Sequence, residues 1–107
     1  MPSPLAGKKL GILVSAAPDQ PNFHHGLAFA RTALENEVTV YLYLLDEAVI
    51  GVDENQLQTL RSNGLKLFAC AYGARQRNLE TDDRATWAGL ATASDVISAT
   101  DRFVSFN

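Results

Sequence analysis

The sequence predicts a single-domain α/β protein with one mostly parallel sheet of about four to five strands. Two observations predict it: short, nearly uniform apolar runs that are typical of buried strands, and longer amphipathic stretches that are typical of helices, alternating along the chain. In such chains the crossovers between parallel strands are right-handed. The 107 residues suffice for one hydrophobic core, so we expect one domain over residues 1–107, with residues 1–8 as a flexible extension.

The first half of the chain is predicted to form a strand, a helix and a second strand. Residues 10–15 are a continuous apolar run bounded by turn formers, which predicts a central strand buried on both faces. After a polar loop at residues 16–22, apolar side chains recur at helical spacing and predict a helix with one apolar stripe. These side chains are Phe23, Leu27, Ala30 and Leu34. Residues 38–44 are β-branched and aromatic, which predicts the second strand.

A short helix and a third strand are predicted next. Asp53 and Gln56 have the spacing of a capping box, so we expect the helix to begin there. The apolar residues of this helix are Leu57 and Leu60. Residues 63–64, Asn-Gly, supply a left-handed stop. Residues 65–70 predict the third strand, which places Cys70 at its carboxyl end.

After Cys70, residues 71–77 have room for about two helical turns, ending at Asn78, a residue type that tolerates a positive φ. Asp82 and Asp83 follow a threonine, and we interpret them as charges in the first turn of a helix.

The end of the chain is predicted to be a last helix and a terminal strand at residues 102–106. The helix is marked by Leu90, Ala93 and Ile97. The predicted order is therefore strand, helix, strand, helix, strand, helix, helix, strand. The aromatic residues Tyr41, Tyr43 and Trp87 are expected in the core or at a subunit contact.

Composition argues against several kinds of partner. Nine Lys and Arg against twelve Asp and Glu give a net charge of −3 with no basic run, so we expect no nucleic acid partner. No apolar stretch approaches the roughly 20 residues that cross a bilayer, so we expect no membrane partner and a soluble, cytoplasmic protein.

Cofactors and metals are not expected either. The loop after the first strand has two prolines and Asp19 and lacks a glycine-rich phosphate motif, which argues against nucleotides and flavins. The single cysteine excludes an intrachain disulfide, and with only two histidines it cannot build a four-ligand zinc site without acidic residues.

Cys70 is the first candidate for chemistry. Reactive groups in parallel sheets lie where the carboxyl ends of the strands meet. The predicted loops that converge there are 15–23, 45–53 and 70–78. A thiol has a pKa of about 8.5 and attacks as the thiolate, which cations and helix amino termini favour. Arg75 and Arg77 supply the cations. The alternative is that Cys70 only completes a core strand, because cysteine is among the most buried residue types.

His24 and His25 open the first helix at the same edge. One of them would orient an incoming donor or favour the thiolate. Adjacent helical residues point about 100° apart, so at most one faces the site, and the alternative for each is a surface position. Asp19, Asp46 and Asp53 lie in the right loops, yet none stands out as the acid of a hydrolase relay.

Three stretches together resemble the DsrE-like sulfur-relay family, which includes the DsrE, DsrF and TusD subunits. Residues 11–14 and 26–30 look like the family's amino-terminal half. Residues 70–79 look like its cysteine loop, in which an arginine, here Arg77, stands seven residues after the cysteine. The family's following glycine is an asparagine in this chain. Residues 101–106 are similar to the closing Asp-Arg-hydrophobic strand.

The resemblance implies a flavodoxin-like, three-layer sandwich that assembles into trimers, hexamers or mixed assemblies with paralogous subunits. It also implies a sulfurtransferase role, in which Cys70 accepts sulfane sulfur from a donor protein as a persulfide and passes it to an acceptor protein. The amides of Ala71 and Tyr72 and the Arg77 guanidinium are suited to stabilise the terminal sulfur. The resemblance leaves open whether the pathway serves tRNA thiolation or sulfur oxidation.

Two alternatives to a sulfur carrier remain. A non-catalytic oligomeric scaffold or interaction subunit of the same fold predicts a thiol that is inert to alkylation. A small-ligand-binding module predicts a gain in thermal stability with its ligand, and indifference to Cys70→Ser.

Overall fold

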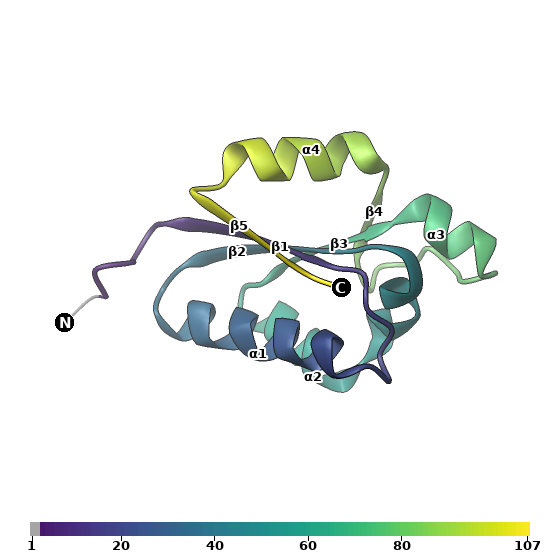
Figure 1. The fold of residues 1–107 in the computed structure, drawn as a ribbon, viewed down its shortest axis with the longest axis horizontal. Coiled ribbons are helices and arrows are strands. Elements are labelled where there is room, and N and C mark those ends of the chain that lie inside the picture. The colour runs from purple at the N-terminus through teal and green to yellow at the C-terminus, as the bar shows by residue number, and fades with distance from the viewer. Residues whose placement is uncertain (1–2) are drawn as a thin grey trace.

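Five parallel strands form one sheet at the centre of the computed structural model, which describes residues 3–107 (Figure 1). The strands are β1 (Lys9–Val14), β2 (Thr39–Leu44), β3 (Lys66–Cys70), β4 (Thr86–Ala88) and β5 (Arg102–Phe106). They lie in the order β4-β3-β2-β1-β5. The predicted α/β fold with a parallel sheet is confirmed, and β1 is a central strand because β2 and β5 flank it.

Helices cover both faces of the sheet (Figure 1). α1 and α2 lie on one face and α4 lies on the other, while α3 continues from the end of β3. The helices are α1 (Pro21–Glu35), α2 (Asn55–Ser62), α3 (Ala71–Gln76) and α4 (Leu90–Ala99), and a 3-10 helix, η1 (Asp46–Asp53), precedes α2. α4 returns the chain across the sheet and places β5 beside β1. Because that return runs in the opposite direction, a right-handed crossover requires the opposite face.

The face under α1 and α2 carries most of the core. Its strand side chains are at most 8% exposed and comprise Leu10, Ile12, Val14, Val40, Leu42, Leu44, Leu67 and Ala69. From α1, the predicted apolar residues Phe23, Leu27 and Ala30 are completely buried against them. Side chains alternate between faces along a strand, so Tyr43 and Cys70 point to the other face, toward the start of α4.

The described part of the predicted extension is attached to the domain. Turns link Ser3 to Ala6 and Leu5 to Lys8, and the Gly7 amide donates a hydrogen bond to the Glu37 carbonyl. Residues 1 and 2 of that extension lie outside the described residues. Within residues 3–107, no helix is both long and apolar enough to span a membrane.

The prediction that Asp82 and Asp83 begin a helix is wrong. The Asp82 carboxylate accepts hydrogen bonds from the backbone amide and the Nε of Arg84, at 3.1 and 2.8 Å, and so closes a turn. The Trp87 indole then donates to the Asp82 carbonyl at 2.8 Å. These bonds leave residues 86–88 extended beside β3, where they form β4, the strand missing from the predicted order.

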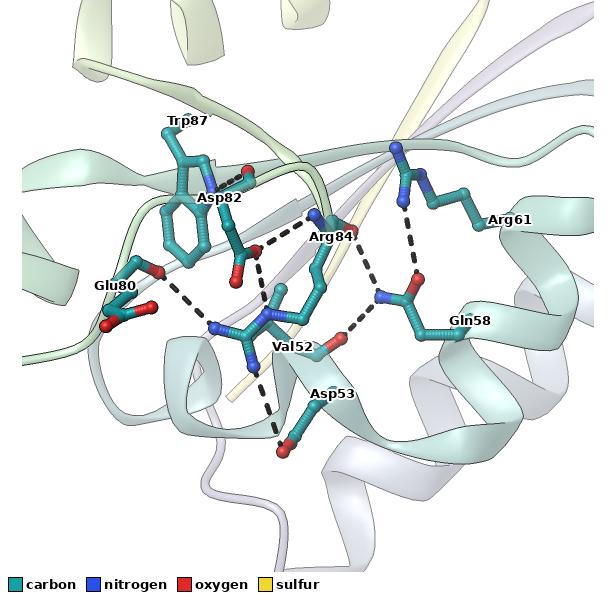
Figure 2. A network of polar contacts seen from close by, with 8 residues as sticks. All are labelled: Val52, Asp53, Gln58, Arg61, Glu80, Asp82, Arg84 and Trp87. Atoms are coloured by element: carbon teal, nitrogen blue, oxygen red, sulfur yellow. Dashed lines mark hydrogen bonds and ion pairs between the residues drawn. The ribbon is translucent and has the colours of Figure 1, made fainter.

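A polar network holds this turn against α2 and η1 (Figure 2). The Gln58 amide donates to the carbonyls of Val52 and Arg84, at 2.6 and 3.0 Å. Arg84 in turn donates to the Glu80 carbonyl and to Asp82, whose pKa is lowered by the hydrogen bonds from Arg84. The network therefore positions β4, whose Ala88 pairs with Cys70 of β3.

The capping box predicted at Asp53 and Gln56 is also wrong. Asp53 is the last residue of η1, and Glu54 takes the N-cap position of α2 without a side-chain capping bond. The physical reason is that η1 continues to this point, since the Glu54 amide still donates to the Gly51 carbonyl at 3.0 Å. Sequence spacing alone did not reveal the 3-10 helix, which was expected to be a loop.

α4 is present as predicted, but its buried side differs. Ala93 and Val96 are its buried residues, whereas Leu90 is 65% and Ile97 is 44% exposed. Only this helix is drawn over its face of the sheet (Figure 1), so it has no neighbouring helix to cover its flanks.

Candidate active site around Cys70

Cys70 is the last residue of β3 and the N-cap of α3. Its Sγ accepts a hydrogen bond from the Gly73 amide, with an N···S distance of 3.4 Å. This is the bond that an N-cap side chain makes to an otherwise unpaired amide of the first helical turn. The residue is only 5% exposed. The thiol therefore lies at the predicted place in the fold, beneath the first turn of α3.

The loop after Cys70 has the predicted shape. α3 covers six residues, and Asn78 follows its C-cap with a φ of 56°, in the left-handed region. The Leu79 amide then donates to the Ala74 carbonyl at 2.9 Å, which closes the helix end. Asparagine thus supplies the conformation for which glycine is the usual residue.

Gly73 brings Cys70 and Arg77 to one place. A Cβ atom on Gly73 would lie 3.5 Å from Val49 of η1, 3.6 Å from the Cys70 Cβ and 3.7 Å from the Arg77 Nη1. The Arg77 guanidinium donates to the Gly73 carbonyl at 3.1 Å and is held over the helix. Arg77 therefore lies beside the first turn of α3, and the amide that donates to the sulfur is that of Gly73.

The other candidates on α3 face outward. Arg75 is exposed in the last turn. Tyr72 is 62% exposed, and its hydroxyl accepts a hydrogen bond from the side-chain amide of Gln76 at 3.0 Å. Ala71 is half-buried. Among the described contacts, no side-chain hydrogen bond joins Arg75 or Tyr72 to Cys70.

The two histidines stay at the start of α1. His24 Nε2 lies 2.7 Å from the Pro18 carbonyl oxygen, and His25 Nδ1 lies 3.1 Å from the Asn22 Oδ1. Both side chains are exposed, and among the hydrogen bonds of residues 3–107 neither ring is joined to Cys70. η1 touches both regions, because its Gly51 adjoins Phe23 and its Val49 adjoins Gly73. The structure thus places the histidines at the same edge of the sheet, but in the first turn of α1 and away from the cysteine loop.

Tyr43 is a neighbour of the thiol that the sequence did not single out. It is 1% exposed, and its hydroxyl donates toward the carbonyls of Ala88 and Gly89, at 3.0 and 3.1 Å. Burial, as the largest cause, and the neighbouring Cys70 together raise the pKa of Tyr43 to about 12. Tyr43 was expected in the core or at a subunit contact. The signal that was available is register, because a parallel pairing of β2 and β3 puts Tyr43 and Cys70 on one face.

No metal cluster accompanies the thiol. Within residues 3–107, no group of three or more His, Cys, Asp or Glu side chains lies close enough together to hold a metal ion. The chemistry available at this site is that of one thiol, the amides and the guanidinium of its loop, and a phenol.

Comparison with known proteins decides the family. The model of the DsrE/DsrF-like family matches residues 8–106, nearly the whole chain. The chain belongs to the DsrE/DsrF-like family. The matched range includes Cys70, Arg77 and the closing strand, so the DsrE/DsrF-like assignment covers all three stretches on which the resemblance was based.

Solved structures agree with the DsrE/DsrF-like fold. The crystal structure of the ychN protein from E. coli is similar with a TM-score of 0.81, at 17% sequence identity, over 92% of this chain and 99% of that chain. At this identity the likeness concerns the fold alone. No match is found among the curated proteins.

Proposed function

We propose that this DsrE/DsrF-like protein is a sulfur-relay protein that accepts and donates sulfane sulfur as a persulfide on Cys70. The observation that carries the proposal is the position of the chain's one cysteine: it ends a strand of the parallel sheet and caps the following helix with its sulfur. That is the sheet edge at which reactive groups of α/β proteins lie. Family membership supports the same chemistry.

The transfer needs neither an oxidant nor a metal. The Cys70 thiolate attacks the outer sulfur of a donor persulfide, a sulfur–sulfur bond forms to Cys70, and the donor's own sulfur–sulfur bond breaks. The donor leaves as a thiolate, so one thiolate enters and one leaves. The acceptor thiolate repeats the step on the outer sulfur held by Cys70.

Groups of the cysteine loop are suited to hold the negative charge. The Gly73 amide already donates to the sulfur, and hydrogen bonds to an ionised acceptor are about twice as strong as neutral ones. Arg77 adds a cation on the same side of Gly73. The amides of Ala71 and Tyr72 begin the helix, and in this proposal they bind the outer sulfur once it is attached.

Access to the thiol requires α3 to move or the partner to reach beneath it, since Cys70 is 5% exposed. α3 has only six residues, of which Gly73 and Ala74 are its buried ones. A short helix with so small a buried surface is easily displaced. The exposed Tyr72 on its outer side is a natural first contact for a donor or acceptor protein.

We also propose that the protein works as an oligomer in the cytoplasm. Several large apolar side chains remain exposed on the monomer, in η1, on α3 and along α4. They are Ile50, Tyr72, Leu90 and Ile97. Copies of this chain, or paralogous subunits, would cover them and gain hydrophobic stabilisation.

A non-catalytic interaction subunit is the second candidate, and the burial of Cys70 favours it. In that case the thiol is core and the exposed residues of α4 carry the function. Both candidates have the same fold, so only the reactivity of the thiol separates them.

Alkylation of the native protein separates the two candidates. Iodoacetamide rates are measured on the folded chain and on the chain unfolded in urea. For a sulfur carrier, we expect the folded protein to react measurably at neutral pH, because displacement of the short helix α3 exposes the thiol. A thiol that reacts only after unfolding would establish the interaction subunit instead.

A further inference from the structure

We propose that the Tyr43 hydroxyl is a positioning group for the Cys70 sulfur, donating a hydrogen bond to it when the sulfur is ionised. The inference rests on the proposed function of Cys70 and adds a residue from a different strand to the site. The register of three strands, together with the hydroxyl's own hydrogen bonds, carries the inference.

The phenol crosses β3 beside Cys70. Tyr43 pairs with Phe68, and Cys70 is two residues further along β3, on the same face. Across β3, Cys70 pairs with Ala88 of β4. The Tyr43 hydroxyl reaches the Ala88 carbonyl at 3.0 Å, so the ring extends from β2 over β3 to the strand position opposite the thiol.

The hydroxyl has one proton, which it directs at the carbonyls of Ala88 and Gly89. The Cys70 sulfur is the third acceptor of this region, because Cys70 lies on the same face of the sheet as Tyr43 and pairs with Ala88. While the thiol is neutral, its S–H can donate to the phenol oxygen and the phenol proton stays on a carbonyl. When the thiol ionises, the sulfur becomes a charged acceptor, and a charge-assisted bond is stronger than a neutral one. Gly89 is exposed, so water can donate a hydrogen bond to its carbonyl when the phenol no longer does.

Few charged groups compete at this spot. From α3 come Arg77 and the Gly73 amide, from η1 comes Val49, and β4 with the start of α4 supplies carbonyl oxygens. The titratable groups placed here are therefore Cys70, Tyr43 and Arg77.

Tyr43→Phe tests the role of the hydroxyl, with Tyr41→Phe as the matched control. Tyr41 lies on the same strand and face, and its ring stacks on Phe68 rather than reaching β4. Alkylation of Cys70 by iodoacetamide is followed against pH in the folded proteins. We expect Tyr43→Phe to shift the profile to higher pH and to slow the reaction at pH 7 about tenfold, a change of about 1.4 kcal/mol. Tyr41→Phe is expected to match the wild type. Equal profiles in all three proteins would overturn the proposal.

A second readout does not need reagent access. The absorbance of tyrosinate reports the ionisation of the three tyrosines, and a Tyr41→Phe, Tyr72→Phe background leaves Tyr43 as the one observed. In that background, Cys70→Ala removes the neighbouring thiolate, so we expect the pKa of Tyr43 to fall from its value of about 12. An unchanged titration would show that the hydroxyl and the sulfur do not interact.

The two proposals fail in different ways. If native Cys70 resists alkylation at every pH while the Tyr43 titration responds to Cys70→Ala, the sulfur-carrier function fails and the contact stands. If wild-type Cys70 is reactive, but Tyr43→Phe does not change its alkylation and Cys70→Ala does not change the Tyr43 titration, the function stands and the role of Tyr43 is refuted.

Discussion

At the scale of single residues, the buried phenol of Tyr43 links the stability of the fold to pH. Its pKa is about 12 in the folded protein against 10.0 in the unfolded chain. A raised pKa means that the folded state keeps its proton longer, so the stabilisation is fully present below pH 10 and is lost as the pH rises toward 12. At about 1.4 kcal/mol per pKa unit, the loss is at most about 3 kcal/mol.

Tyr43→Phe is therefore expected to flatten the dependence of stability on pH above pH 10. It should also lower stability at pH 8 by about 1 kcal/mol, because the carbonyls of Ala88 and Gly89 lose their donor. Urea unfolding at a series of pH values measures both effects. A variant that loses stability above pH 10 as steeply as Tyr41→Phe would show that the buried phenol is not the titrating group.

The residues of the site differ in how far sequence alone predicted them. The place of Cys70 followed from the strand pattern, and the left-handed Asn78 followed from the asparagine after two helical turns. The bond from the Gly73 amide did not, because it depends on which amide the N-cap side chain meets. Tyr43 was missed for another reason: it lies on the strand next to β3, on the same face as Cys70, and the order of neighbouring strands is not encoded in local spacing.

At the scale of elements, η1 is the piece on which two parts of the site depend. Its Gly51 packs so closely on α1 that an added Cβ would lie 2.5 Å from the Phe23 ring and 2.8 Å from Pro18. Its Val49 lies beside Gly73 at the start of α3. A displacement of η1 would therefore affect both the start of α1, which carries the two histidines, and the cysteine loop.

Gly51→Ala should destabilise the protein by about 1 to 3 kcal/mol, because Phe23 is completely buried and its ring has no room to yield. Gly89→Ala is the matched control, since nothing lies within 4 Å of its added Cβ. Urea midpoints of the two variants make the comparison. Equal midpoints would mean that η1 does not pack on α1 as closely as described.

Gly73→Ala addresses α3 itself. The added methyl group would make ordinary contacts at 3.5 to 3.7 Å, so the helix should gain about 0.5 to 1 kcal/mol from the better helix former. The methyl group would also occupy the space between Cys70 and Arg77, so we expect slower alkylation of a more stable protein. Thermal unfolding measures the stability, and iodoacetamide rates measure the reactivity of the thiol. A variant that is stabilised and fully reactive would show that Arg77 does not contribute to the reactivity of Cys70.

The elements that sequence misjudged are those held by long-range polar contacts. Asp82 follows a threonine, as at the start of a helix, but its carboxylate accepts a hydrogen bond from the Arg84 side chain. The side chain of Gln58 in α2, which is 26 residues away in sequence, donates to the Arg84 carbonyl (Figure 2). β4, with three residues, is too short to give a hydrophobic period of its own. It is a strand because β3 pairs with it.

At the scale of the whole molecule, the fold was predictable because its signal is distributed over the entire chain. Apolar strands alternate with amphipathic helices, and this pattern survives an error at any one boundary. The DsrE/DsrF-like family match over residues 8–106 and the TM-score of 0.81 to the ychN protein agree with that architecture. Function rests on a far smaller signal, the few residues around Cys70, which is why it requires a direct chemical test.

The most direct test is the intact mass of the reduced protein after incubation with a small sulfane-sulfur donor, with Cys70→Ser treated in parallel. We predict a mass gain of one sulfur atom in the wild type, none in the variant, and loss of the added sulfur when an acceptor thiol is supplied. Wild-type protein that gains no sulfur while folded, or a Cys70→Ser variant that gains as much, would contradict a relay through Cys70.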